Sequence, residues 1–118
     1  MPPKEYYLEL IEKEFSTAQE ALKIGNDGKA RVCARRAAGQ AITWFLSEHP
    51  NAEWGRDAMT QLLHLKDDPA VSQEIRDAAL RLTTKISGRF IYSFSSDPIA
   101  DAGLIVDYFR KRMEADAS

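Results

Sequence analysis

Hydrophobic residues recur along most of this chain with the spacing of an α-helix. Across residues 5–24, apolar side chains follow one another in steps of three or four, at Tyr7, Ile11, Phe15, Ala18 and Leu22. A stripe of this kind on an otherwise polar segment indicates an amphipathic helix with one face in a core. The residues "GNDG" at 25–28 can end that helix and turn the chain. A second helix is predicted over residues 29–47.

The same periodicity predicts three further helices, over residues 52–66, 70–86 and 98–113. The last two each follow an Asp-Pro pair, Asp68-Pro69 and Asp97-Pro98. In such a pair the aspartate can cap the helix, and proline suits the first helical position because an N–H group there would have no partner. Both pairs are therefore expected to start a helix.

Residues 89–94, "RFIYSF", are the exception to the helical pattern. Their aromatic side chains alternate as in a strand, but no other segment offers a partner strand, and an isolated strand is not stable. We interpret them as an extended connector that follows Gly88, a suitable C-terminal cap for the fourth helix. The sequence thus predicts an all-α fold, a compact up-and-down bundle of four to five helices in one domain, residues 1–118.

Composition restricts the kinds of function. The 118 residues carry a net charge of −2, so contact with nucleic acid would need a local basic patch. Cys33 is the only cysteine and there are two histidines, which make no recognisable zinc site, so no metal or other cofactor is expected. The first residues do not resemble a signal peptide, and no apolar run is long enough to span a membrane. We expect a cytoplasmic protein.

The second predicted helix carries the densest basic run, with Arg31, Arg35 and Arg36. Arg31 and Arg35 share one side of the helix, whereas Arg36 lies about 100° further round. One narrow stripe of the same helix holds only small residues, namely Ala30, Ala34, Ala37 and Ala41. Small side chains let another helix approach closely, and apolar residues on other faces indicate that this helix is the central one.

Three interpretations of the arginines are open. Their stems can pack on the bundle while the guanidinium groups pair with carboxylates of the first helix. Alternatively, Arg31 and Arg35 form a clamp for a phosphate near the helix N-terminus. Arg36 would extend such a site, as would Arg89 and Tyr92 of the connector, where an aromatic ring can stack on a base. The arginines can also be simply solvated, and the connector aromatics can instead close one end of the bundle.

The residues "AQEAL", "RRAAGQAI" and "RDAALRL" of three predicted helices resemble HEPN domains (higher eukaryotes and prokaryotes nucleotide-binding). The resemblance implies a helical bundle, frequently dimeric, in nucleotide- or RNA-linked systems that include toxin–antitoxin pairs. Family members that cleave RNA carry an arginine and a histidine separated by four to six residues. Here the nearest match, Arg56 and His64, has seven residues between its members. On one helix these side chains would lie about 80° apart in rotation and about 12 Å apart along the axis. The catalytic assignment therefore does not transfer.

The sequence thus predicts a non-catalytic binding or assembly module, with no catalytic residue assigned. Its ligand is either a nucleotide or RNA, bound through the basic second helix, or another protein, as a homodimer or with a partner chain. An HEPN-type RNase is the third interpretation. Cys33, beside the alanine stripe, and His49, at a helix end, are interpreted as structural residues.

Overall fold

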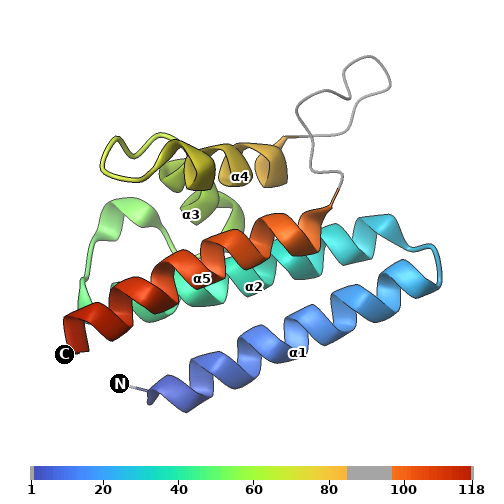
Figure 1. Cartoon of the computed structure of the whole chain (residues 1–118), viewed down its shortest axis with the longest axis horizontal. Coiled ribbons are helices and arrows are strands. Elements are labelled where there is room, and N and C mark those ends of the chain that lie inside the picture. The colour runs from blue at the N-terminus through green and yellow to red at the C-terminus, as the bar shows by residue number, and fades with distance from the viewer. Residues whose placement is uncertain (1, 85–96, 118) are drawn as a thin grey trace.

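The computed structural model describes residues 2–84 and 97–117, and within these ranges every regular element is a helix. In chain order the elements are α1 (Lys4–Lys23), α2 (Asp27–Glu48), the 3-10 turn η1 (Ala52–Trp54), α3 (Ala58–Leu65), α4 (Gln73–Thr83) and α5 (Pro98–Ala117) (Figure 1). The all-α prediction is confirmed. No helix in the described ranges combines the length and apolar character needed to cross a membrane. Gly88 and the connector 89–94 lie outside the described residues.

The turn between α1 and α2 follows directly from its glycine and asparagine. Gly25 has a φ of +77°, a left-handed conformation that glycine adopts without a steric penalty. The N–H of Asn26 reaches the carbonyl oxygen of Ala21 (2.8 Å) and that of Gly25 reaches Leu22 (3.1 Å), which closes the end of α1. The Asn26 side chain then accepts a hydrogen bond from the N–H of Lys29 (3.1 Å) and caps α2.

The central position predicted for the second helix is confirmed, because α2 packs against α1, α3 and α5. All four residues of its alanine stripe are completely buried, namely Ala30, Ala34, Ala37 and Ala41. Gly39 brings α3 closer still: a Cβ atom at this position would lie 2.7 Å from the Cβ of Ala58. The small side chains of α2 therefore set how closely its neighbours approach.

The third predicted helix, 52–66, is interrupted. Gly55, with a φ of +74°, separates η1 from α3. Asp57 caps the start of α3, since its carboxylate accepts hydrogen bonds from the N–H (2.9 Å) and the hydroxyl (2.7 Å) of Thr60. The continuous apolar periodicity of the segment concealed this break, since a single glycine is tolerated within many helices.

The two Asp-Pro pairs have different outcomes. Asp97 caps α5 as predicted, by accepting a hydrogen bond from the N–H of Ala100 (3.1 Å). Asp68 instead forms a turn, in which its side chain accepts from the N–H of Ala70 (2.9 Å) and its carbonyl oxygen from Val71 (3.1 Å). The prediction that α4 begins at the first pair is therefore wrong, and the helix starts at Gln73. Asp-Pro favours turns as well as helix starts, and here the turn is formed.

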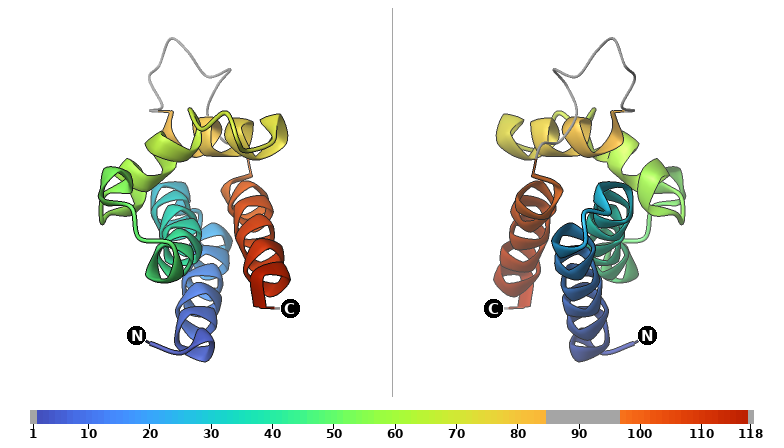
Figure 2. Two further views of the ribbon diagram at one scale, coloured as in Figure 1. Left: turned by 90° about the vertical axis from the view of Figure 1, so that its left-hand side faces the viewer. Right: turned by 90° about the vertical axis from the view of Figure 1, so that its right-hand side faces the viewer.

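Figure 2 shows α1, α2 and α5 as long helices, with α4 lying across the bundle on the side away from α1. One apolar core includes residues from all five α-helices, as expected for a single domain. Helices α2 and α5 run in the same direction, whereas α1 runs opposite to both (Figure 1). The start of α1 therefore lies beside the end of α5, where Lys4 and Glu114 form an ion pair of 3.8 Å.

Candidate functional site

The two arginines of the predicted clamp face the corner where α4 ends and α5 begins. Arg35 donates a hydrogen bond from Nη1 to the carbonyl oxygen of Leu82 (3.3 Å), near the end of α4. Burial lowers the pKa of both Arg31 and Arg35. The carboxylates of Asp27 and Asp101 oppose that effect on the pKa of Arg31. The groups given for Arg31 and Arg35 thus belong to α2, α4 and α5, whereas the partners expected from the sequence were carboxylates of α1.

Arg81 completes this corner. Its Nε and Nη2 atoms donate to the two carboxylate oxygens of Asp101, at 3.1 Å and 2.8 Å, and this hydrogen bonding raises the pKa of Arg81. Asp101 itself is only 7% exposed. The corner therefore joins α2, α4 and α5 through buried and half-buried charges, which is a structural role.

Arg36, the third arginine of the predicted binding site, does not lie at this corner. Arg36 is exposed and lines a separate cleft between α2 and α3. Arg89 and Tyr92 lie outside the described residues, so their predicted part in a site stays a prediction. The basic second helix therefore presents its arginines in two directions, as the helical wheel indicated.

The cleft beside Arg36 consists of two adjoining cavities. The smaller, of about 250 Å³, is lined by Glu14, Arg36, Gly39, Gln40, Thr43, Arg56, Ala58 and Gln61. The larger, of about 650 Å³, shares Thr43, Arg56 and Gln61 with it and adds Tyr7, Leu46, Ser47, Pro50, Asn51 and Gly55. One end of the cleft is thus polar and basic, and the other is more apolar.

Gln61 is the buried polar residue of this cleft and was not identified from the sequence. Its side chain is only 2% exposed, and its Nε2 donates to the hydroxyl oxygen of Thr43 (3.1 Å) and to the carbonyl oxygen of Gly55 (3.5 Å). These bonds tie α3 to α2 and to the turn before α3. A glutamine on an otherwise apolar helical face is the one signal that would have pointed to it.

A second surface feature is a groove between α1 and α5. Both helices pack on α2 but make little contact with each other. The groove has a volume of about 300 Å³ and is lined by Leu8, Ile11, Glu12, Phe15, Gly103, Val106, Asp107 and Arg110. At Gly103 an added Cβ would meet no heavy atom within 4 Å, so this wall of the groove is open to a neighbouring backbone.

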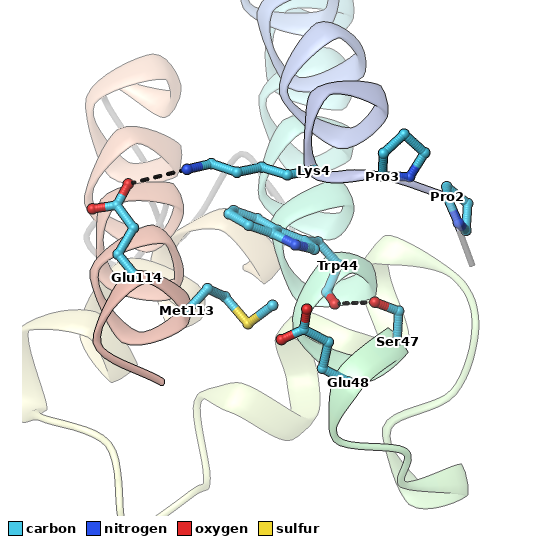
Figure 3. A pocket seen from close by; sticks show the side chains of 8 residues that line it. All are labelled: Pro2, Pro3, Lys4, Trp44, Ser47, Glu48, Met113 and Glu114. Carbon is cyan, nitrogen blue, oxygen red and sulfur yellow. Dashed lines mark hydrogen bonds and ion pairs between the residues drawn. The ribbon is translucent and has the colours of Figure 1, made fainter. Parts of the chain in front are cut away.

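A third surface feature is a pocket of about 430 Å³ at the end of the bundle where α1 begins. Figure 3 shows Lys4 reaching across from α1 to Glu114 of α5, above the indole of Trp44 and the thioether of Met113. Trp44 is itself held by Tyr7, whose ring stacks on it at a centroid distance of 6.4 Å. The pocket therefore has an apolar floor and a charged rim.

His49 and Cys33 lie where the sequence suggested, at a helix end and in the core. His49 stacks on Phe45 (ring centroids 4.4 Å apart) and its Nδ1 lies 3.3 Å from the Phe45 carbonyl oxygen, at the end of α2. The ring of His64 lies against Trp54, with centroids 4.3 Å apart, and does not line the cleft that contains Arg56. The thiol of Cys33 is buried.

No group of three or more His, Cys, Asp or Glu side chains in the described ranges is arranged to hold a metal ion. Comparison of the chain with protein families, with curated proteins and with solved structures finds no match. The resemblance to HEPN domains therefore stays a prediction from the sequence.

Proposed function

We propose that this protein is a non-catalytic helical assembly module that forms a homodimer through the groove between α1 and α5. The observation that carries the proposal is the position of Asp107 and Arg110, which are three residues apart and line the same groove. An arrangement with one charge of each sign on one face of a helix is self-complementary.

Part of the groove lining is apolar, so covering it with another helix would be favourable. Leu8 and Phe15 of α1 are only partly buried and pack against the core at its edge, and Gly103 leaves room for a helix from a second copy. Covering these side chains would gain hydrophobic free energy of roughly 25 cal/mol per Å² of apolar surface removed from water. The gap between α1 and α5 is thus suited to a helix.

The charges select a second copy of the chain as the occupant. A two-fold axis that crosses α5 between Asp107 and Arg110 places each Arg110 opposite the Asp107 of the other copy. Glu12, on the α1 wall of the groove, adds a second carboxylate for the incoming guanidinium group. In the described part of the chain, none of these three side chains forms an ion pair of its own.

The geometry supports assembly better than nucleotide or RNA binding through Arg31 and Arg35. These two arginines are directed into the corner of α2, α4 and α5, where Arg35 bonds to a backbone carbonyl. A guanidinium group already used within the protein contributes little to the neutralisation of an RNA backbone.

Charge exchange tests the dimer. Sedimentation velocity of wild type is expected to show a concentration-dependent dimer, and Asp107→Arg or Arg110→Asp alone is expected to shift it to monomer, because like charges then oppose each other. The double variant D107R/R110D restores the complementarity and should dimerise. An equimolar mixture of the two single variants should form the heterodimer for the same reason.

Lys111→Asp is the control matched to Arg110→Asp, since it makes the same charge change on an exposed residue of α5 that does not line the groove. It is expected to dimerise like wild type. A wild type that stays monomeric, or single variants that dimerise as well as wild type, would contradict the proposal.

A further inference from the structure

The cleft between α2 and α3 has the composition of an anion site. We infer that it binds a small phosphate monoester, with the phosphate at the end lined by Arg36 and Arg56. Arg36 belongs to α2, and Arg56 belongs to the turn before α3. Gly39 lets the start of α3 approach the middle of α2 closely, at Ala58, and this contact brings the turn with Arg56 against α2.

The two guanidinium groups are available to a ligand. Arg36 and Arg56 are both exposed, and neither takes part in an ion pair with another described residue. The carboxylate next to Arg56, that of Asp57, is already used to cap α3 through Thr60. Two arginines can offer paired N–H donors to the oxygens of one phosphate.

Among the described residues, Glu14 supplies the one carboxylate that lines the smaller cavity. Its carboxylate raises the pKa of the buried Cys33 thiol, so it lies near the contact between α1 and α2. With two arginines and one glutamate, the lining has a formal charge of +1, in a protein whose net charge is −2. The cleft is thus locally positive on an acidic molecule.

Thr43 supplies a neutral donor. Its hydroxyl oxygen accepts a hydrogen bond from the buried Gln61 (3.1 Å), so its own proton remains to be donated. The hydroxyl of Thr83, in α4, donates to the carbonyl oxygen four residues earlier, but Thr43 makes no such bond in the described part of the chain. Because Thr43 lines both cavities, its proton can point to a ligand oxygen.

The size of the cleft selects a small ligand. The larger cavity, of about 650 Å³, continues from Arg56 and Thr43 to Tyr7, Leu46 and Pro50, which can contact a compact organic group. Two exposed arginines are enough for one phosphate but not for a long stretch of nucleic acid, whose binding depends on neutralising many phosphates. A phosphate monoester therefore fits better than RNA.

Amide chemical shifts of the full-length protein test this site. Titration with adenosine 5′-monophosphate, the probe chosen, is expected to shift the amide signals of Gly39, Thr43 and Gln61. Arg36→Gln and Arg56→Gln should each weaken binding about tenfold or more, because each removes a charge-assisted contact. Thr43→Val, which keeps the shape of the side chain, should weaken it by a smaller factor.

Lys13→Gln is the control, because it removes one positive charge from an exposed residue of α1 outside the cleft; it should bind like wild type. Adenosine without phosphate should cause no saturable shift.

The inference is overturned if wild type does not bind the nucleotide, or if R36Q and R56Q bind it unchanged. Equal affinity for inorganic phosphate would contradict a role for the organic group, and tighter binding of a short RNA would contradict a small ligand. The dimer variant D107R has the cleft intact and should bind as wild type.

Discussion

The guanidinium group of Arg81 on α4 holds both carboxylate oxygens of Asp101 on α5, with N–O distances of 3.1 Å and 2.8 Å. This pair stands where α4 crosses α5, and its carboxylate also acts on Arg31 of α2. The carboxylate of Asp101 thus interacts with basic residues of two other helices, Arg81 of α4 and Arg31 of α2. The corner is expected to matter for folding, because a nearly buried carboxylate is the common partner.

Asp101→Asn is therefore expected to lower the free energy of unfolding by about 2–3 kcal/mol, between the values typical of surface pairs and of buried pairs. The side chain of Arg81 is 38% exposed, which keeps the loss below that of a fully buried pair. Urea denaturation measures it. Asp67→Asn is the control, since the Asp67 side chain is 73% exposed in its ion pair with Lys66 and this pair should contribute less than about 1 kcal/mol. Equal losses in the two variants would show that the corner is no more important than a surface pair.

Substitution by alanine is expected to have opposite effects on stability at two glycines of α2. At Gly39 an added Cβ would lie 2.7 Å from Ala58, so Gly39→Ala should force α3 outward and cost about 1–3 kcal/mol. At Gly28 the nearest atom lies 4.0 Å away, so Gly28→Ala should stabilise the protein by about 0.5–1 kcal/mol through helix propensity. Thermal denaturation compares the two. A Gly39→Ala variant as stable as wild type would mean that α2 and α3 are not in close contact.

These two glycines also illustrate what the sequence could predict. The alanine stripe and the central position of α2 follow from the helical period, because a core face must repeat every three or four residues. Gly39 does not disturb the helical spacing of the apolar residues, so the sequence pattern gives no sign that α3 approaches α2 closely at this position. The partner of Arg35 is a backbone carbonyl 47 residues away, which depends on how α4 crosses the bundle. Local patterns do not encode such a crossing.

The break at Gly55 was missed for a related reason. The apolar residues on both sides of this glycine keep a helical period, and only the left-handed backbone separates η1 from α3. A continuous helix over residues 52–66 would place Arg56 on the same helix as His64. In the structure Arg56 belongs to the turn before α3 and lines the same cleft as Arg36. The candidate phosphate site thus depends on a turn that periodicity does not reveal.

Cys33 should make the protein less stable at alkaline pH. Burial raises the pKa of this thiol, and the carboxylate of Glu14 raises it further. Below the ordinary thiol pKa of about 8.5, the thiol is protonated in both the folded and the unfolded state. Above that value the unfolded state loses the proton while the folded state retains it, so the free energy of unfolding decreases as the pH rises.

Cys33→Ala removes this contribution, and its free energy of unfolding is expected to fall less than that of wild type between about pH 8 and pH 10. Urea denaturation at a series of pH values makes the comparison. The native thiol should also react slowly with a thiol reagent, because it is buried and protonated. Parallel pH profiles of the two proteins, or rapid modification of the native thiol, would show that Cys33 is accessible to solvent.

Replacing Arg31 and Arg35 together with glutamine separates a structural role from a phosphate clamp. The hydrogen bond from Arg35 to the Leu82 carbonyl is lost, and Asp101 loses a neighbouring positive charge. The free energy of unfolding is expected to fall by about 1.5–3 kcal/mol, as for hydrogen bonds to charged groups. The control K13Q/K29Q removes the same charge from exposed residues and should change the free energy of unfolding by less than about 0.5 kcal/mol.

Titration with a short RNA at two salt concentrations completes the test, and neither wild type nor the double variant is expected to bind tightly. Unchanged stability, together with salt-dependent RNA binding by wild type alone, would assign these arginines to a phosphate clamp instead.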